Sequence, residues 1–308
     1  MPSLAVTLGE LQLANPILSA SGTFGHGLEM EQFAPPERLG GLVSKTVTLR
    51  PRPGNPAPRI HETEAGFLNS IGLENRGLET YLAETLPEVA GADTRIFCNI
   101  GGESPEEYAR LAALLDERSE IDALEINLSC PNVQGGRLPF STDPALAERC
   151  VRAVREATSK PIFAKLSPNV SRIAELAVAV EQGGADGITA VNTLLGMQVD
   201  WRSGKPGLAT VMGGYSGQGI KPVALRCAWE CVQAVSIPVL GCGGIADADD
   251  VLEFLAVGCA AVQVGTASFS DPGLLGHLAA DLAARLEAAG LESIAQVRGS
   301  LERHLSAK

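Results

Sequence analysis

The chain has 308 residues, of which 45% are hydrophobic and 19% charged, a balance that suits a folded protein with a large core rather than a disordered chain. Its 24 basic and 36 acidic residues give a net charge of −12, which disfavours nonspecific binding to nucleic acid or to an anionic membrane. No apolar run reaches the roughly 18 residues of a membrane span, and the first residues show no signal-peptide pattern, so we expect a cytoplasmic protein.

The predicted elements begin with a short β-hairpin over residues 5–13, which turns at Gly9-Glu10 and is expected to close the floor of a barrel. Short apolar runs then recur eight times, and their continuous apolar character is typical of strands buried on both faces. They cover residues 16–20, 41–46, 95–100, 123–129, 161–167, 187–192, 238–243 and 261–266. Helical periodicity lies between them, at residues 105–118, 144–158, 173–182, 222–235, 248–256 and 274–289. This order predicts an α/β fold, a (β/α)8 TIM barrel forming one domain over residues 1–308.

Three of the helices are expected to begin at a capping residue followed by proline: Ser104-Pro105, Asp143-Pro144 and Asp271-Pro272. The rhythm of strands and helices is interrupted at residues 47–74 and 194–216, where Gly and Pro are frequent. Both insertions follow strand ends. We therefore expect them to lie over the face formed by the C-terminal ends of the strands, where barrel enzymes carry their active sites.

Nearly every predicted strand ends in small or polar residues, which a barrel gathers around one mouth. Lys45 and Lys165 end the second and fifth strands; each is a solvated lysine in the simplest interpretation, but two cations in one mouth suit an anionic ligand. The last two strands end in Cys242-Gly-Gly-Ile245 and Gln263-Val-Gly-Thr266. Gly-Gly after one strand is often an ordinary turn, but the two endings together favour a phosphate held by backbone N–H groups.

The seven cysteines have no C-x-x-C spacing, which indicates reduced thiols and no metal site. Cys130 stands apart because it follows a strand end, precedes Pro131 and begins a Gly-containing loop over residues 132–139. A buried, inert thiol is the usual state of cysteine. A thiol at the mouth of a barrel can instead remove a proton as thiolate or attack a carbon.

Five segments carry a family resemblance: Asn15-Pro-Ile-Leu-Ser-Ala-Ser-Gly-Thr-Phe-Gly25, Ser44-Lys-Thr46, Asn69-Ser-Ile-Gly-Leu-Glu-Asn75, Asn127-Leu-Ser-Cys-Pro-Asn132 and Gly214-Tyr-Ser-Gly-Gln-Gly-Ile-Lys-Pro222. With them, essentially the whole chain resembles the dihydroorotate dehydrogenases, and specifically the catalytic subunit of the NAD-linked class 1B enzymes. The resemblance implies FMN as the cofactor and oxidation of dihydroorotate to orotate in pyrimidine (UMP) biosynthesis.

The resemblance also implies three groups of site residues. Those around the isoalloxazine and ribityl parts of FMN are Ser21, Lys45, Thr46, Asn99, Asn127, Lys165 and Val191. Those at its phosphate end are Gly217, Gly243, Gly244, Gly265 and Thr266. Those at the substrate are Lys45, Asn69, Ser70, Ile71, Gly72, Leu73, Asn127, Asn192 and Thr193. In the implied chemistry, Cys130 removes the C5 proton, a hydride moves from C6 to the flavin, and Lys165 stabilises the anionic reduced flavin.

The sequence has no G-x-G-x-x-G nicotinamide motif and no cluster-binding cysteine set, so the electrons must leave through another component. The resemblance implies a partner subunit with FAD and a 2Fe-2S cluster that passes electrons to NAD, in a heterotetramer of two of each subunit built on a homodimer. Alternatives are a fumarate-dependent class 1A homodimer, a flavin enzyme like dihydropyrimidine dehydrogenase, or a barrel that only binds a partner. A further alternative is an isomerase or aldolase with Lys165 as a Schiff-base amine.

Overall fold

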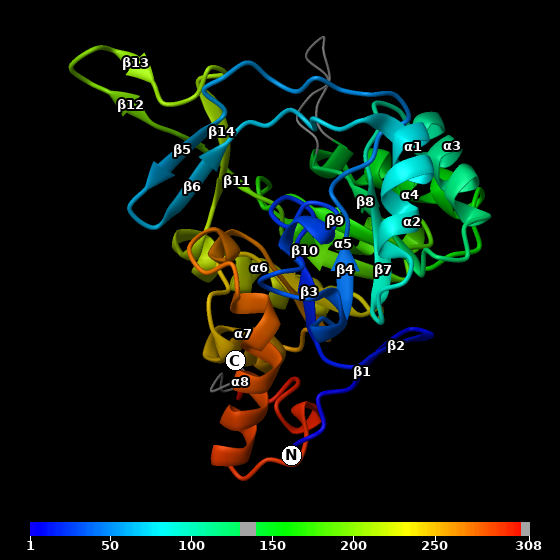
Figure 1. Ribbon diagram of the computed structural model, residues 1–308, viewed down its shortest axis with the longest axis vertical. Coiled ribbons are helices and arrows are strands. Elements are labelled where there is room, and N and C mark those ends of the chain that lie inside the picture. Colours follow the sequence, from blue (N-terminus) through cyan, green and yellow to red (C-terminus); the bar gives the residue numbers. More distant parts are fainter. Residues whose placement is uncertain (130–139, 303–308) are drawn as a thin grey trace, which may run out of the picture.

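The computed structural model describes residues 1–129 and 140–302, and within them parallel strands close into a barrel (Figure 1). In order around the barrel, these strands are β3 (Ile17–Ser19), β4 (Gly41–Val43), β7 (Arg95–Ile100), β8 (Ala123–Asn127), β9 (Ile162–Leu166), β10 (Gly187–Ala190), β15 (Val239–Cys242) and β16 (Ala261–Val264). Each lies inside one of the eight predicted runs, which confirms the TIM barrel. All but β7 are shorter than predicted, because residues at one or both ends leave the hydrogen-bonded ladder, and those at the C-terminal ends shape the mouth.

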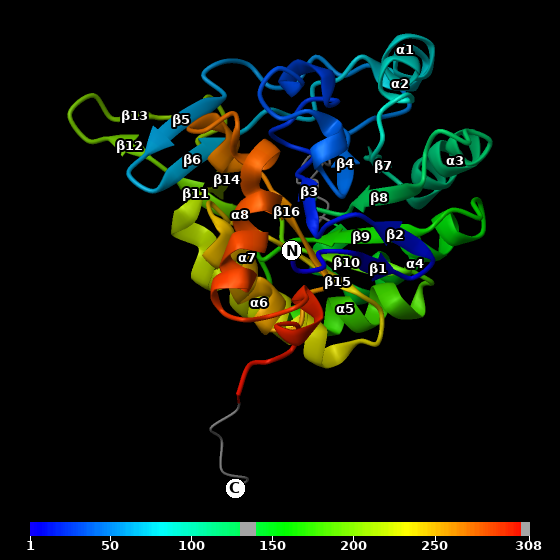
Figure 2. The same cartoon turned by 60° about the horizontal axis from the view of Figure 1, so that its bottom comes forward.

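The floor of the barrel is closed by an N-terminal hairpin, as predicted. Its strands β1 (Val6–Leu8) and β2 (Leu11–Leu13) pair in antiparallel register, and Figure 2 shows them beside the barrel strands. Leu8 and Leu13 are buried in one apolar cluster with barrel residues that include Phe97 and Phe163. These two rings meet edge to face with centroids 5.2 Å apart. The lower half of the barrel is therefore solid, and any ligand must enter from the opposite end.

Helices pack around the outside of the barrel. They are α3 (Pro105–Asp116), α4 (Pro144–Arg155), α5 (Ile173–Gln182), α6 (Lys221–Ala234), α7 (Ala248–Ala256) and α8 (Leu274–Ala288). Between β4 and β7 lie α1 (Gly77–Thr80), the π-helical turn η3 (Tyr81–Thr85) and α2 (Leu86–Val89), which the sequence did not predict. Short 3₁₀ turns complete the set: η1 (Leu28–Met30), η2 (Pro36–Arg38), η4 (Phe140–Thr142), η5 (Gln218–Ile220), η6 (Thr266–Phe269) and η7 (Ile294–Gln296). No helix in residues 1–129 and 140–302 combines the length and apolar character of a membrane span.

Two of the three predicted helix starts are confirmed. The Ser104 and Asp143 side chains accept hydrogen bonds from backbone N–H groups in the first turns of α3 and α4. The third capping prediction was wrong: α8 begins at Leu274, as its predicted range has it, but Gly273 rather than Asp271 occupies the N-cap position. The Asp271 carboxylate instead accepts from Gly273 N–H at 3.0 Å, so these residues form a turn that precedes the helix.

The two insertions meet above the C-terminal ends of the barrel strands. One contributes β5 (Ile60–Thr63) and β6 (Gly66–Asn69), and the other β11 (Leu194–Met197) and β14 (Met212–Ser216). They form one antiparallel sheet in the order β11-β14-β6-β5, which we call the roof sheet (upper left in Figure 1). A hairpin of β12 (Val199–Asp200) and β13 (Lys205–Pro206) extends from it. The predicted position of the insertions is confirmed, whereas their strands were not predicted.

Candidate active site

A cavity of about 1130 Å³ lies between the strand ends of the barrel and the roof sheet. The structure brings every predicted site residue to its wall except Asn99 and Cys130. The predicted residues on the wall are Ser21, Lys45, Thr46, Asn69, Ser70, Ile71, Gly72, Leu73, Asn127, Lys165, Val191, Asn192, Thr193, Gly217, Gly243, Gly244, Gly265 and Thr266. Asn99 is fully buried beneath the wall, and Cys130 lies outside the described residues. Segments far apart in the sequence thus converge on one space.

One end of the cavity is a cradle of backbone N–H groups. Gly217 and Gly244 have φ of +103° and +82°, and Gly243 has φ of +129°, conformations that side chains rarely adopt. A Cβ atom on Gly244 would lie 2.6 Å from Lys221 Cβ. Within the described chain, the N–H groups of Gly243, Gly244, Gly265 and Thr266 donate to no protein acceptor. Several backbone N–H groups without a protein acceptor, beside the start of α6, suit a phosphate group.

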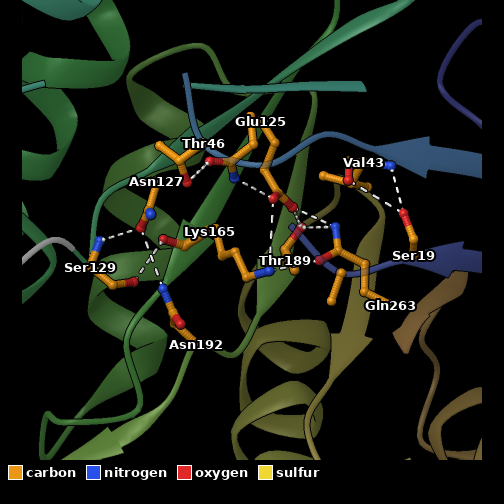
Figure 3. A network of polar contacts seen from close by, with 12 residues as sticks. Ser19, Val43, Thr46, Glu125, Asn127, Ser129, Lys165, Thr189, Asn192 and Gln263 are labelled. Carbon is orange, nitrogen blue, oxygen red and sulfur yellow. Dashed lines mark hydrogen bonds and ion pairs between the residues drawn. The ribbon is translucent and has the colours of Figure 1, made fainter. Parts of the chain in front are cut away.

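The floor of the cavity holds a buried charged network, drawn in Figure 3. Lys165 is only 4% exposed, and its Nζ donates to Gln263 Oε1 at 2.8 Å. Glu125 Oε1 lies 3.7 Å from the same Nζ. The fully buried Glu125 carboxylate also accepts from Asn99 Nδ2 at 2.6 Å, from Thr189 Oγ1 at 2.8 Å and from Gln263 Nε2. Lys165 therefore presents a positive charge to the cavity, and the compensating negative charge of Glu125 lies beneath the cavity floor.

Sequence reasoning missed Glu125, Thr189 and Gln263 as parts of this network. A signal existed for Glu125, since a carboxylate in the middle of a strand buried on both faces needs partners inside the protein. The partners themselves sit on β10 and β16, and only the closed barrel brings them to β8.

Amide side chains line the wall near Lys165. Asn192 Nδ2 donates to Asn127 Oδ1 at 3.3 Å, and Ser129 N–H donates to the same oxygen at 3.3 Å. The Asn127 carbonyl oxygen accepts from the buried Tyr108 hydroxyl at 2.6 Å, which fixes the backbone at this strand end. With its Oδ1 occupied from two sides, the Asn127 side chain directs its NH2 group to other partners.

Lys45 provides a second cation on the wall. Its backbone N–H donates to Gly25 O at 2.8 Å, and among the described residues its ammonium forms no ion pair within 4.0 Å. Burial lowers the pKa of His26, Glu29 raises it and the nearby charge of Lys45 lowers it further. The adjacent Thr46 hydroxyl donates to Asn99 Oδ1 at 2.5 Å, which connects this wall to the buried network.

The segment 69–73 is held against the cavity by the roof sheet and the loop before it. Asn69 Nδ2 donates to Gly214 O at 3.2 Å, across the β6–β14 pair. Asn55 Nδ2 donates to Ser70 Oγ at 2.8 Å. Gly72 has φ of +76°, and a Cβ there would lie 2.7 Å from Asn55 N. The sequence did not predict the role of Asn55 in fixing this segment.

The six cysteines in the described chain are buried. Burial raises the pKa of Cys98, Cys150 and Cys259 to about 12, so their thiols stay protonated near neutral pH. Cys242 lines the cavity, where burial raises its pKa although the charge of Lys165 opposes this.

Comparisons with known proteins agree with this architecture. A family model described as dihydroorotate dehydrogenase matches residues 3–286. The chain is 48% identical over 301 residues to the dihydroorotate dehydrogenase B (NAD(+)) catalytic subunit of Pelobacter propionicus, covering 98% of this chain and 99% of that one. The subunit of the same name from Solidesulfovibrio magneticus is 48% identical over 298 residues, with 96% and 97% covered. That from Anoxybacillus flavithermus is 46% identical over 299 residues, with 97% and 96% covered.

Proposed function

Because the chain belongs to the dihydroorotate dehydrogenase family, we propose that it oxidises dihydroorotate to orotate as the FMN-binding catalytic subunit of an NAD-linked enzyme. The observation that carries the proposal is the convergence of two lysines, several amide side chains and a cradle of unpaired backbone N–H groups on one cavity. A cavity of about 1130 Å³ has room for a flavin and a small substrate together.

The residues present fit FMN. The ribityl phosphate would be bound by the N–H groups at Gly243, Gly244, Gly265 and Thr266, with Gly217 allowing close approach. Around the rest of the cofactor we place Ser21, Lys45, Thr46, Asn127, Lys165 and Val191, with Asn99 acting through its hydrogen bond to Thr46. Bound FMN supplies the acceptor for the hydride that leaves C6 of dihydroorotate. The ammonium of Lys165 stabilises negative charge on the side of the cofactor that it faces.

The substrate is held by groups that match its edges. Asn127, Asn192 and Thr193 present amide and hydroxyl groups, which can donate to and accept from the ring amides of a dihydropyrimidine. Lys45 and the backbone N–H groups of the segment 69–73 suit its carboxylate. These contacts orient C5 and C6 and exclude water from the floor of the cavity.

Formation of the C5=C6 double bond requires removal of a proton from C5 as the hydride leaves C6. We assign the proton to Cys130 Sγ, which acts as the thiolate. The assignment rests on the position of Cys130 in the sequence, directly after Asn127-Leu-Ser129 at the end of β8. Cys242, which lies on the wall of the cavity in the described part of the chain, has a pKa raised by burial and ends β15 beside the phosphate cradle.

The electrons leave through a partner subunit. The relatives are named catalytic subunits of NAD-linked enzymes, a name that implies a second, electron-transferring component. We propose that this component carries FAD and a 2Fe-2S cluster, and that two copies of each subunit assemble around a homodimer of this chain.

An absorbance spectrum of the purified chain tests the proposal directly. We expect flavin absorbance, and bleaching on anaerobic addition of dihydroorotate; a colourless protein that does not take up FMN contradicts it. Reoxidation is then followed with NAD plus the partner subunit and, separately, with fumarate. Turnover with fumarate alone would indicate the class 1A reaction instead.

A further inference from the structure

The proposed reaction uses Lys165 but gives no role to Glu125, Thr189 or Gln263, which lie beneath it. Glu125 on β8 is fully buried in the barrel interior, and its partners come from β7, β9, β10 and β16 (Figure 3). None of Asn99, Glu125, Thr189 and Gln263 reaches the cavity wall, so none is placed to contact a ligand. A buried carboxylate that contacts no ligand needs another reason to be there, because removing its charge from water is costly.

The hydrogen-bond partners of Glu125 suit a carboxylate, because two of the three are amide NH2 groups that can only donate. Asn99, Thr189 and Gln263 each contribute a donor to the carboxylate, and a protonated carboxyl would direct its own hydrogen at one of them. In the described chain, the cation that compensates this charge is Lys165, with Nζ 3.7 Å from Glu125 Oε1.

Gln263 links the two charged groups. An ammonium has only donors, so Lys165 Nζ needs the carbonyl oxygen of the Gln263 amide, which it contacts at 2.8 Å. The NH2 group of the same amide donates to Glu125 Oε2. A carboxylate at one end and a cation at the other fix the orientation of the amide. Gln263 Oε1 and Glu125 Oε1 thus fix the position of Lys165 Nζ from beneath the cavity floor. The remaining N–H groups of Lys165 face the cavity.

We propose that Glu125 and Gln263 are positioning residues for the reaction: they keep the Lys165 ammonium charged and hold it at the floor of the cavity. The inference rests on the proposed function insofar as Lys165 faces the flavin. Without the carboxylate, a lysine that is 4% exposed keeps only one amide oxygen, and burial then favours its uncharged amine. Thr189 and Asn99 complete the set by satisfying the remaining acceptor sites of the carboxylate.

The first test needs no cofactor. The full chain without FMN is trace-labelled with acetic anhydride near neutral pH, and labelling of Lys165 is read by peptide mass spectrometry. We expect about a thousandfold more labelling of Lys165 in Glu125→Gln than in the unchanged chain, because burial without the carboxylate favours the uncharged amine, the form that reacts. Glu125→Asp, which keeps the charge, should restore low labelling. Lys221, which is paired with Asp250 and Glu253, is the internal control and should be labelled equally in all three proteins.

The second test is the midpoint potential of bound FMN. Glu125→Gln should lower it, because the positive charge of Lys165 on the cavity floor is lost, and Glu125→Asp should stay near the unchanged protein. In a Lys165→Met background the same Glu125→Gln change removes only a negative charge, so the potential should stay or rise. Gln263→Leu should also lower the potential, since Lys165 then loses its 2.8 Å acceptor.

The outcomes separate the two proposals. Unchanged Lys165 labelling in Glu125→Gln, or a raised potential while Lys165 is present, overturns the role of Glu125. Failure of the unchanged chain to bind FMN overturns the proposed function, while the labelling test still decides the role of Glu125. Thermal unfolding and circular dichroism of each variant show whether it is folded, and Glu125→Asp provides the conservative variant if Glu125→Gln does not fold.

Discussion

The amide of Asn192 is hydrogen-bonded to the amide of Asn127 at 3.3 Å, which joins the ends of β10 and β8 on either side of β9. The bond occupies Asn127 Oδ1 and leaves the NH2 group of Asn127 for a ligand. Asn127→Leu keeps the approximate volume but removes this donor. We expect the KM for dihydroorotate to rise about tenfold, corresponding to a hydrogen bond worth about 1.4 kcal/mol.

The control for this change is the thermal unfolding midpoint, which should fall only slightly because Asn127 lies at the end of its strand. Steady-state titration with dihydroorotate measures KM. An unchanged KM in a folded Asn127→Leu protein would remove Asn127 from the substrate site.

Lys45 is predicted to bind the substrate carboxylate. In Lys45→Met the charge-assisted contact is lost, worth about 1.5 to 3 kcal/mol, so kcat/KM should fall by roughly one to two orders of magnitude. The matched control is Lys205→Met, which removes an equal charge from the exposed hairpin β12–β13. If the two variants lose activity equally, net charge rather than a specific contact is responsible.

Cys130 is predicted to be the cysteine most reactive toward iodoacetamide in the native protein. Burial raises the pKa of Cys98, Cys150 and Cys259 to about 12, and a thiol with a raised pKa stays protonated up to a higher pH than an ordinary thiol. These thiols are therefore unreactive at pH 7 to 9, and inactivation should accelerate with rising pH as Cys130 ionises. Peptide mapping identifies the alkylated residue, and orotate should slow its modification. Faster alkylation of Cys242 would transfer the proposed base to that residue.

Gly244→Ala should abolish tight FMN binding. At φ of +82° the new Cβ is strained, and it would lie 2.6 Å from Lys221 Cβ and 2.8 Å from Lys221 N, so the cradle must shift. We also expect a loss of about 1 to 3 kcal/mol in the free energy of unfolding. Gly91→Ala is the control, because its added Cβ meets nothing within 4 Å and its φ is ordinary. FMN fluorescence quenching measures affinity, and a Gly244→Ala protein that binds FMN normally would contradict the phosphate site.

Leu13→Ala should lower stability without changing chemistry. Leu13 is 2% exposed in the floor cluster, and such a truncation costs about 2 to 5 kcal/mol. Denaturant unfolding measures the loss, whereas FMN affinity should be retained because the cradle lies at the opposite end of the barrel. Exposed Gln12, next to it on β2, gives a neutral control as Gln12→Ala.

The barrel could be predicted from the sequence because its strands and helices are each marked by residues within the element itself. Runs of successive apolar residues, such as 239–242, predict strands covered on both faces, and Ser104-Pro105 marks a helix start by itself. The segment 77–89 escaped prediction because a Gly with φ of +82° begins it and a π-helical turn interrupts its periodicity.

From the residue pattern alone, the candidate site could be predicted only at the ends of the barrel strands, whereas the segment 69–73 and Gly217 were predicted from the family resemblance. The roof sheet depends on pairing between Asn69 and Gly214, which are 145 residues apart, and Gly-rich strands carry little alternation to reveal it. The network under Lys165 was missed for a related reason. In the sequence, Gln263 looks like an ordinary strand residue. Its role appears only when the barrel closes, because pairing of β16 with β3 brings its side chain within hydrogen-bonding distance of Glu125 across the barrel interior.

The shared roof sheet also restricts how this protein can be recombined with its relatives. β6 and β14 hydrogen-bond to each other although they belong to separate insertions. A chimaera that exchanges residues 47–74 alone would pair β6 from one parent with β14 from the other, two strands that did not evolve together. Crossovers that carry both insertions from one parent should yield active proteins far more often than crossovers that fall between them.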